Sequence, residues 1–178
     1  MVIVIREFLE KDVLSIQTIY REAFKGFPWF ENLTDEEVQI RWQRQSTKKC
    51  FSCVVAEVDE RLVGATWWDT ISPEQLLVER GIRLADFVGN FYGFDLVWLR
   101  ETCVRPKYQG QGIAQALKLA VIGKLAILNK PILLLTRMRE DNLPIISINR
   151  KLGFKRTGIK VPSSQIAGVY HEYWYKKQ

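Results

Sequence analysis

Cysteine and histidine are scarce in this chain, and their scarcity excludes several kinds of site. Among 178 residues there are three cysteines and one histidine, and an odd number of cysteines argues against a disulfide framework. Cys50 and Cys53 form a CxxC pair, but the segment CFSCVVAEV has the character of a strand, on which residues three apart face opposite sides. No second pair and no nearby histidine completes a set of zinc ligands. We therefore expect neither a disulfide nor a metal site.

Long runs of one residue class are also missing. No apolar run approaches the roughly 18 residues of a membrane-spanning helix, and the opening MVIVIREF is too short and too soon charged for a signal peptide. The net charge of +6 comes from scattered lysines and arginines rather than from a basic tail. We expect a cytoplasmic protein, a monomer or homodimer, that binds neither a membrane nor nucleic acid. The positive charge suits an anionic ligand.

The spacing of apolar residues predicts the secondary structure of a single domain over residues 1–178. The second predicted helix opens with the capping-box pair Thr34 and Glu37, and the fourth is capped by Asn142 and ends at Gly153 in a left-handed conformation. Residues 72–93 are ambiguous between helix and loop. Predicted helices lie at residues 13–24, 34–47, 113–128 and 142–153, and predicted strands at residues 2–5, 51–58, 62–70, 94–104, 132–136, 154–157 and 169–175.

The order strand, helix, strand over residues 94–136 predicts a parallel strand pair. Residues 132–136 read ILLLT, which is typical of a strand buried on both faces. We therefore expect an α/β (α+β) fold, with a mixed sheet and helices on both of its faces.

The stretch YQGQGIA at residues 108–114 joins the first strand of that pair to its helix. Glycine is favoured where the backbone needs a positive φ or approaches a ligand closely, and a turn that opens a helix directs N–H groups at one spot, where phosphate often binds. The string of a P-loop is absent, and a dinucleotide fingerprint would need a glycine where Gln115 stands. An ordinary strand-to-helix turn would explain one glycine but not two.

This turn resembles a known motif. The residues QGQGIA at 109–114 fit Q/R-x-x-G-x-G/A, the acetyl-CoA motif of the GNAT superfamily of N-acetyltransferases, and VRPKY at 104–108 resembles that family's V-x-P-x-Y lead-in. Further along the chain, Asn142 and the LGF at residues 152–154 resemble the family's helix-to-strand element. The resemblance covers residues 94–175.

The resemblance implies acetyl-CoA as the co-substrate, without a metal, on a mixed, mostly antiparallel sheet with a central splayed parallel strand pair. The amides of the turn would hold the pyrophosphate, and Gln109 would brace the loop. Edge groups of the two splayed strands would pair with the pantetheine arm. The residues implied in CoA binding are Cys103, Val104, Gln109, Gly110, Gln111, Gly112, Ile113, Ala114, Asn142 and Asn149.

Acetyl transfer to an amine requires loss of an amine proton, stabilisation of the thioester oxygen and departure of the CoA thiolate. The resemblance implies the backbone N–H of Val104 as the donor to that oxygen. Glu101 lies three residues before Val104 on the same predicted strand and is our first candidate for the general base, directly or through a water. Asp95 is the second candidate and Glu172 the third. For each of them a solvated or ion-paired carboxylate is the alternative.

The general acid departs from the family pattern. Many family members carry a tyrosine on the helix before LGF, where this chain has Asn149, which donates hydrogen bonds but cannot act as an acid. Tyr173 is our candidate to protonate the thiolate, with Tyr170 or solvent as alternatives, and either tyrosine could instead be a packing aromatic. His171 is either structural or a base. Cys103 is interpreted as a small core residue rather than as an acyl-cysteine nucleophile.

We expect an N-acetyltransferase that moves the acetyl group of acetyl-CoA to a primary amine by direct attack, on a small-molecule or peptide acceptor. Transfer of a longer acyl group, and a regulatory module that binds acyl-CoA without turnover, are the alternatives. The positive net charge argues against polycationic acceptors. The aromatic residues expected either to border an acceptor cleft or to pack in the core are Phe27, Trp29, Phe30, Trp67, Trp68, Phe91 and Tyr92.

Overall fold

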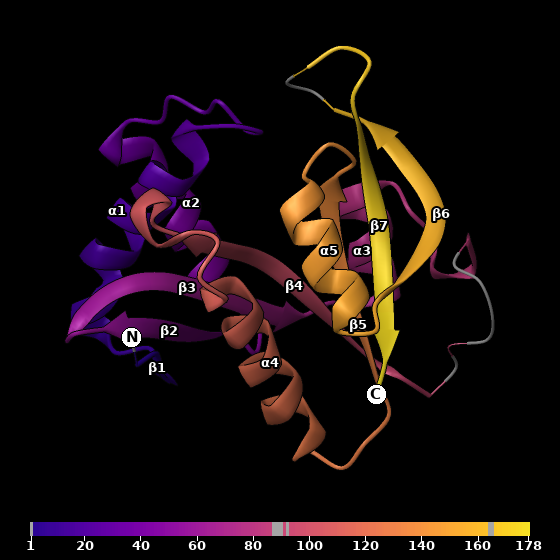
Figure 1. The fold of residues 1–178 in the computed structure, drawn as a ribbon. Helices are drawn as coiled ribbons and strands as arrows, with labels where there is room; N and C mark the ends of the chain where they lie inside the picture. Colours follow the sequence, from indigo (N-terminus) through magenta and orange to yellow (C-terminus); the bar gives the residue numbers. More distant parts are fainter. Residues whose placement is uncertain (1, 87–90, 92, 164–165) are drawn as a thin grey trace. The chain divides into compact units, whose positions relative to one another are not determined.

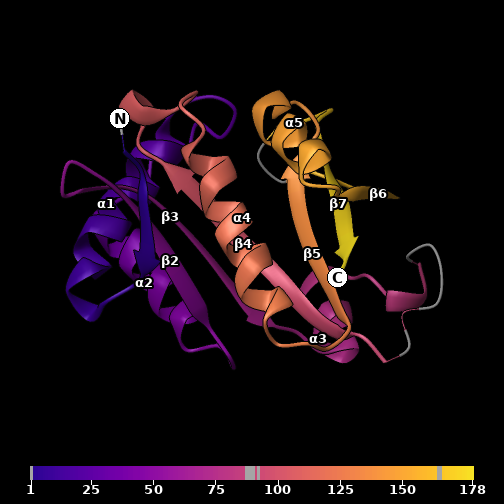
Figure 2. The ribbon, with the colours of Figure 1, turned by 60° about the horizontal axis from the view of Figure 1, so that its bottom comes forward.

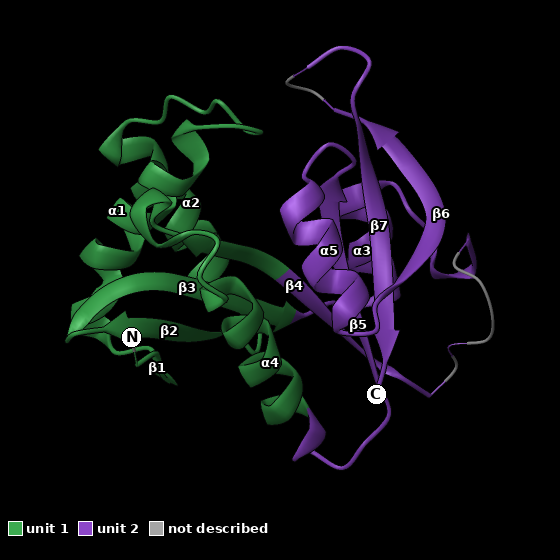
Figure 3. Ribbon diagram, viewed as in Figure 1, with its two compact units in different colours: residues 1–69, 100–125 green, residues 70–99, 126–178 purple. Residues whose placement is uncertain are grey.

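The structure of the chain is a computed structural model that describes residues 2–86, 91, 93–163 and 166–178 (Figure 1). Tyr92, one of the aromatic residues singled out above, lies outside the described residues. The chain divides into two compact units (Figure 3): unit 1 comprises Met1–Asp69 and Arg100–Leu125, and unit 2 comprises Thr70–Leu99 and Ala126–Gln178. That the whole chain acts as one domain stays a prediction.

The described residues form seven strands and five α-helices. The strands are β1 (Val4–Glu7), β2 (Ser52–Val58), β3 (Arg61–Thr70), β4 (Asp95–Val104), β5 (Ile132–Arg139), β6 (Lys155–Pro162) and β7 (Tyr170–Lys177). The helices are α1 (Val13–Lys25), α2 (Asp35–Ser46), α3 (Pro73–Arg80), α4 (Ile113–Ala126) and α5 (Leu143–Lys151), with short 3₁₀ turns η1 (Glu10–Asp12), η2 (Leu84–Asp86) and η3 (Pro106–Tyr108).

The strands follow the order β1-β2-β3-β4-β5-β7-β6 in one sheet. The pairs β1–β2, β2–β3, β5–β7 and β6–β7 are antiparallel. β4 and β5 run parallel, and their pairing ends at Leu99 and Thr136 although both strands continue. The predicted mixed, mostly antiparallel sheet with one parallel pair is therefore confirmed. The first part of β4 belongs to unit 2 and its last five residues, 100–104, belong to unit 1.

In unit 1, α1 and α2 cover one face of the strands. α1 forms because its apolar residues recur at helical spacing, and the side chains of Ile16, Ile19, Tyr20 and Phe24 on this face are buried. α2 begins at the predicted capping box, in which Thr34 Oγ1 accepts the N–H of Glu37 at 3.2 Å and the Glu37 carboxylate accepts the N–H of Thr34 at 2.8 Å. The cluster beneath these helices contains Ile16, Ile19, Tyr20, Phe24, Val38, Trp42, Cys53, Val55, Ala65, Trp67 and Cys103.

The opposite face of the strands in unit 1 is covered by α4 (Figure 2). Gly64 on β3 permits this packing. A Cβ at position 64 would lie 3.2 Å from the side chains of Ile113 and Leu117 and 3.1 Å from the carbonyl oxygen of Cys103. Any larger residue would therefore displace the first turns of α4, and with them the glycine turn that precedes the helix.

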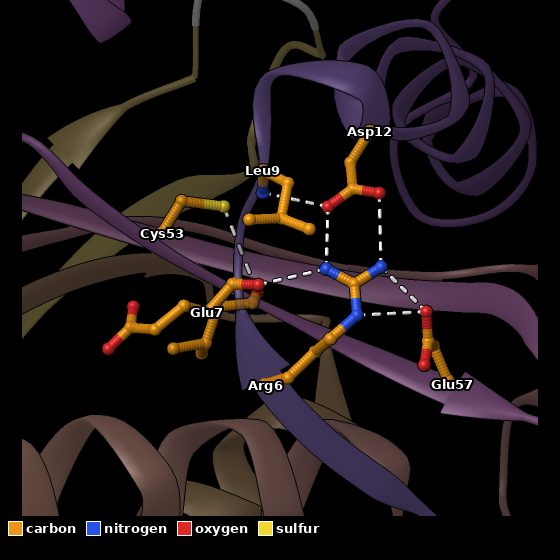
Figure 4. A network of polar contacts seen from close by, with 7 residues as sticks. Arg6, Glu7, Leu9, Asp12, Cys53 and Glu57 are labelled. Atoms are coloured by element: carbon orange, nitrogen blue, oxygen red, sulfur yellow. Dashed lines mark hydrogen bonds and ion pairs between the residues drawn. The ribbon is translucent and has the colours of Figure 1, made fainter.

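Strand β1 is held in unit 1 by Arg6 (Figure 4). Its guanidinium donates to both carboxylate oxygens of Asp12, at 2.7 and 3.0 Å, and to Glu57 on β2 at 2.6 and 2.9 Å. Asp12 is buried and also accepts the N–H of Leu9 at 2.8 Å. The hydrogen bonds from Arg6 hold the pKa of Asp12 below its ordinary value.

In unit 2, α3 and α5 lie against opposite faces of the strands. Leu133 and Leu135 of β5 face the side of α3, in a cluster with Ile71, Leu76, Ile82, Phe91, Leu96, Trp98 and Tyr173. Met138 has the opposite parity on β5 and therefore points to the other face. There its sulfur accepts a hydrogen bond from Asn149 Nδ2 of α5 at 3.3 Å.

Element types agree with the predictions, whereas several boundaries were wrong. β1 lies two residues later than predicted because Val4–Glu7 is the part that pairs with β2. α4 ends at Ala126, two residues before the predicted end at residue 128, and Leu128, beyond the helix, is 54% exposed. β6 continues to Pro162 because its pairing with β7 extends to Tyr170. The ambiguous stretch contains α3, capped by Ser72 and ended by Gly81 with φ +68°.

Candidate active site

The two glycines of the turn have the positive φ angles that glycine favours. Gly110 has φ +76° and Gly112 has φ +83°, a region that favours glycine. A Cβ built on either residue would meet no other atom within 4 Å. The open space beside the backbone of both residues is what close approach of a ligand to a turn requires.

Gly112 is also the residue directly before α4. Its carbonyl accepts the N–H of Ala116 at 2.9 Å, the first hydrogen bond of the helix. The N–H groups of the first helical turn have no partner within the helix, and glycine provides no side chain to cap them. Free amides and the helix dipole at a helix N-terminus favour an anion, and Ile113, packed beneath Gly64, anchors this helix start to the sheet of unit 1.

Two glutamine side chains fasten the turn. Gln109 Nε2 donates to the carbonyl of Val104 at 3.0 Å, so the predicted brace is confirmed. Gln111 Nε2 donates to the carbonyl of Lys107 at 3.1 Å, within the turn itself. Ala114, the last residue of the motif, is half-buried in the first turn of α4.

The end of β4 orients the backbone of Val104. The N–H of Arg105 donates to Val63 on β3 at 2.8 Å, and the carbonyl of Cys103 lies beside Gly64 of the same strand. Because successive backbone groups of a strand point to opposite edges, the N–H and C=O of Val104 both point away from β3. The N–H implied as oxyanion donor therefore lies on the same edge as the carbonyl that Gln109 fastens.

Glu101 is half-buried on β4 and points to the face of unit 1 that carries α1 and α2, since it has the same parity as Cys103. Its charge acts on two groups there. Burial first and then the charge of Glu101 raise the pKa of the Tyr20 hydroxyl, and the same two causes raise the pKa of the Cys103 thiol. Thr66 Oγ1 donates to the carbonyl of Glu101 at 2.7 Å and fixes the backbone at this point.

Tyr20 links Glu101 to a polar chain that the sequence did not indicate. Arg41 Nη1 donates to the Tyr20 hydroxyl at 3.2 Å and to Glu31 at 2.6 Å. A small, mainly apolar cavity lies beside this chain, lined by Ile16, Gln17, Tyr20, Val38, Arg41, Trp42, Gln45 and Trp67. Tyr20 is one of several buried residues at helical spacing in α1, so nothing local in the sequence distinguishes it.

A buried ion pair flanks Glu101. Arg100 donates to both carboxylate oxygens of Asp69, at 2.8 and 3.0 Å, and both side chains are almost fully buried. A bidentate pair of this kind has a fixed geometry, so the pair holds the neighbouring strands β3 and β4 rigidly beside the candidate base. The sequence did not predict this pair either.

Cys103 is a core residue, as we interpreted it. The side chain is 2% exposed within the cluster beneath α1 and α2, and Sγ lies 3.6 Å from the carbonyl oxygen of Ala65, to which it donates. Burial raises the pKa of its thiol, so the thiolate that a covalent route needs is disfavoured. Cys53 is buried in the same cluster, and Cys50 is exposed.

In unit 2, both candidate asparagines on or beside α5 are used within the fold. Asn142 caps α5 as predicted, with Oδ1 accepting the N–H of Ile145 at 3.4 Å. Asn149 is fully buried, donates to the sulfur of Met138, and accepts the N–H of Phe154 with its backbone carbonyl at 2.9 Å. Gly153, with φ +79°, ends this segment as predicted.

The remaining candidates of unit 2 lie on β4 and β7. Tyr173 is 1% exposed and packs against Trp98 with ring centroids 5.9 Å apart. Glu172 is buried and accepts from Trp174 Nε1 at 3.1 Å. Asp95 is half-exposed and pairs with Lys130. Burial and the charges of nearby arginines lower the pKa of His171 to about 4, so the imidazole is neutral at pH 7.

Among the residues that the structure describes, no group of three or more histidine, cysteine, aspartate or glutamate side chains is placed to hold a metal ion. Within the same residues, no helix has the length and apolar character needed to cross a bilayer. Of the aromatic residues singled out from the sequence, Trp67 lines the small cavity of unit 1, Phe91 packs in the apolar cluster of unit 2, and Phe27 and Phe30 are exposed.

Comparison with protein-family models assigns most of the chain to one family. A family model described as the acetyltransferase (GNAT) family matches residues 14–154, which include the turn, β4, β5 and α5. No curated protein sequence matches the chain significantly.

Solved structures share the fold at low sequence identity. A ribosomal-protein-alanine N-acetyltransferase from Brucella melitensis is 19% identical with a TM-score of 0.71, over 98% of this chain and 99% of the other. A GNAT superfamily phosphinothricin acetyltransferase from Sinorhizobium meliloti, in complex with acetyl-CoA, is 18% identical with a TM-score of 0.71, over 99% and 89%. The PaiA N-acetyltransferase from Thermoplasma acidophilum, in complex with coenzyme A, is 16% identical with a TM-score of 0.66, over 100% of both chains.

Proposed function

The chain belongs to the GNAT family of acetyltransferases, and we propose that it moves the acetyl group of acetyl-CoA to a primary amine by direct attack. Acetyl-CoA-dependent transfer to an amine is the activity that family membership assigns. The route, the residues and the kind of acceptor, a small molecule or a peptide, are the proposal. One observation carries it: two glycines with positive φ and open space beside them stand in the turn directly before α4, within the matched region.

In this proposal the turn of unit 1 holds the pyrophosphate of CoA. The amides of residues 110–114 supply hydrogen-bond donors, and the helix dipole favours the negative charge. Gln109 and Gln111 keep the loop in its binding conformation through their bonds to Val104 and Lys107. The geometry supports the fit because a side chain on Gly110 or Gly112 would occupy the space into which the phosphates must come.

Glu101 takes the amine proton in this proposal, directly or through a water. Its place three residues before Val104 on β4, half-buried on the face that carries α1 and α2, supports the assignment. The amine then attacks the thioester carbon. The N–H of Val104 donates to the thioester oxygen as negative charge develops on it.

The departing CoA thiolate must be protonated. The proposal keeps two candidate proton donors. Tyr173 is the side-chain candidate, although it lies in the apolar cluster of unit 2. Solvent is the other. Asn149 is not a candidate, because an amide cannot act as an acid and its Nδ2 donates a hydrogen bond to the sulfur of Met138.

The proposal is tested by binding and turnover together. Acetyl-CoA at 100 times its dissociation constant should stabilise the protein by about 2.7 kcal/mol, visible as a raised melting temperature. Adding a panel of primary amines should then release free CoA thiol. A raised melting temperature without thiol release would favour the non-catalytic binding module. Faster release from octanoyl-CoA than from acetyl-CoA would favour the longer acyl group. An unchanged melting temperature with no heat of binding would refute the proposal.

A further inference from the structure

The register of β3 against β4 can be followed within unit 1. The two strands are neighbours in the sheet. The N–H of Arg105 donates to the carbonyl of Val63 at 2.8 Å, and the hydroxyl oxygens of Thr66 and Thr102 lie 2.9 Å apart. Between these two contacts β3 advances along the sequence while β4 goes back by the same number of residues. The strands therefore run antiparallel, with Thr66 opposite Thr102.

This register places Glu101 directly opposite Trp67, the next pair along the two strands. Directly opposed residues point to the same face and have Cβ atoms about 5 Å apart. Trp67 is buried in the cluster beneath α1 and α2, and its Nε1 donates to Gln45 Oε1 of α2. The ring centroid of Tyr20, on α1, lies 5.9 Å from that of Trp67. Tyr20 and Glu101 therefore adjoin the same indole ring, whose position α2 fixes.

The hydroxyl of Tyr20 is oriented by Arg41. Arg41 Nη1 donates to this hydroxyl at 3.2 Å and is itself held by the Glu31 carboxylate at 2.6 Å. A hydroxyl that accepts a hydrogen bond directs its own proton away from the donor, so the Tyr20 proton points away from Arg41. Among the described residues, the Tyr20 hydroxyl makes no second hydrogen bond. Its proton is therefore available to a group that comes beside it.

Tyr20 keeps this proton at neutral pH. Burial first, and then the negative charge of Glu101, raise the pKa of the hydroxyl. The hydrogen bond and charge of Arg41 act in the opposite direction, and Glu31 adds a smaller effect of the same sign as Glu101. A neutral phenol donates a hydrogen bond without losing its proton. Tyr20 is thus suited to orient a carboxylate or a water rather than to act as an acid.

We propose that Tyr20 is a positioning residue for the general base, and that its hydroxyl donates to the Glu101 carboxylate, or to the water through which Glu101 acts, while the amine loses its proton. One oxygen of the carboxylate, or one lone pair of the water, then faces Tyr20, and the other accepts the amine proton. Tyr20 keeps its own proton throughout. This inference rests on the proposed function and deepens it, because it names a residue that acts through the proposed base.

Tyr20→Phe removes the hydroxyl and keeps the ring that packs against Phe24 and Trp67. We expect kcat for a primary amine to fall roughly 10-fold, the lower end of the range for a hydrogen bond to a charged group. The Kd for acetyl-CoA and the KM for the amine should not change. Tyr175→Phe is the matched control, because Tyr175 is a half-buried packing tyrosine of unit 2. A raised KM with parental kcat would assign Tyr20 to acceptor binding and overturn the inference.

A double-mutant cycle distinguishes action through Glu101 from general damage. The Glu101→Gln protein lacks the proposed base, so adding Tyr20→Phe to it should lower kcat by less than about 2-fold, the limit within which independent effects are measured. The same change in the parent should cost the full 10-fold stated above. Losses that multiply in the double variant would show that Tyr20 acts independently of Glu101, and would overturn the inference.

Arg41 offers a second approach that leaves Tyr20 intact. Arg41→Met removes the donor that orients the hydroxyl, and we expect kcat to fall roughly 2- to 10-fold. Arg41→Lys keeps a cationic donor and should recover part of this loss. Arg44→Met is the matched control, because Arg44 is exposed on the same helix. Parental kcat in Arg41→Met, or equal losses in the methionine and lysine variants, would overturn the inference.

Binding and stability measurements separate this inference from the proposed function. Acetyl-CoA is titrated calorimetrically into the parent and into Tyr20→Phe, and the melting temperatures of both proteins are measured. Equal Kd values and similar melting temperatures, together with the loss of kcat, support the inference. A much lower melting temperature of Tyr20→Phe would assign the hydroxyl a structural role and overturn it. Parental kcat in Tyr20→Phe would overturn the inference alone, whereas a parent that neither binds acetyl-CoA nor releases thiol would refute the proposed function.

Discussion

The side chain of Gln109 donates a hydrogen bond of 3.0 Å to the carbonyl of Val104, five residues earlier in the chain. This bond joins the glycine turn to the last residue of β4. Val104 directs both its C=O and its N–H away from β3, so this contact fastens the backbone on the edge of β4 that carries the N–H proposed to stabilise the thioester oxygen. Gln109 is therefore a positioning residue in the proposed mechanism.

Replacing Gln109 should weaken the site more than replacing its neighbour. Gln109→Met keeps the length of the side chain and removes the donor, and we expect affinity for acetyl-CoA to fall roughly 2- to 10-fold, the range of one neutral hydrogen bond. Gln111→Met is the matched control, because its bond to Lys107 lies within the exposed turn. Titration calorimetry measures both. Equal losses in the two variants would contradict the special role of Gln109.

A methyl group on Gly112 should interfere with the cofactor. Gly112→Ala adds a Cβ where the structure leaves open space, and it also strains a backbone with φ +83°. Gly81→Ala controls for strain, since Gly81 has φ +68° and equally open surroundings at the end of α3. Both variants should lose about 1–2 kcal/mol of stability, but only Gly112→Ala should lose affinity for acetyl-CoA. Unchanged affinity would make the turn purely structural.

Glu101→Gln tests the general base. The variant keeps the shape of the side chain and removes the proton acceptor, so acetyl-CoA binding should survive while turnover at neutral pH falls roughly 10²-fold. The deficit should shrink as pH rises toward the amine pKa of about 10.4, because more acceptor arrives deprotonated. A pH–rate profile measures this trend. A deficit of the same size at every pH would point to structural damage, and parental turnover would transfer the role to Asp95, tested by Asp95→Asn.

The network of Arg6 should make stability depend on acid pH. Hydrogen bonds from Arg6 lower the pKa of Asp12 from its ordinary value of 3.8, so the contribution of Asp12 is present above about pH 3.8 and is lost as pH falls below it. Asp12→Asn should cost roughly 1.5–3 kcal/mol at pH 7, and the difference from the parent should vanish in strong acid. Denaturant unfolding at several pH values measures this. Asp59→Asn, in the exposed β2–β3 turn, should change little at any pH.

His171 should make the stability of the fold depend on pH in a range above that of Asp12. Its pKa is lowered from 6.5 to about 4, so the unfolded chain binds a proton at this residue between these values and the folded chain does not. Stability should therefore fall as pH drops from about 6.5 to about 4. His171→Gln should flatten this part of the stability curve, as measured by denaturant unfolding. An unchanged slope would show that the folded protein accepts the proton at His171.

Local sequence patterns determined the turn, the caps and most element types. Two glycines flank one glutamine at the start of an apolar period, and both glycines have the positive φ that this arrangement predicts. Thr34 and Glu37 form their capping box, and Asn142 and Gly153 bound α5 as predicted. These features depend on residues within a few positions of one another, so their physics is present in the local sequence.

Only the tertiary structure decided which distant side chains meet. The chain from Glu31 through Arg41 to Tyr20, beside Glu101, joins two helices and a strand, and Tyr20 has an ordinary core position in its own helix. Lys118 follows Leu117 in α4 and is 2% exposed, so that burial lowers its pKa to about 7. The place of His171 opposite Arg139 depends on strand register, which pairs residues more than 30 positions apart. Local periodicity indicates which face of its element a residue lies on. The charged groups near that residue come from the neighbouring strand or helix, which the local sequence does not specify.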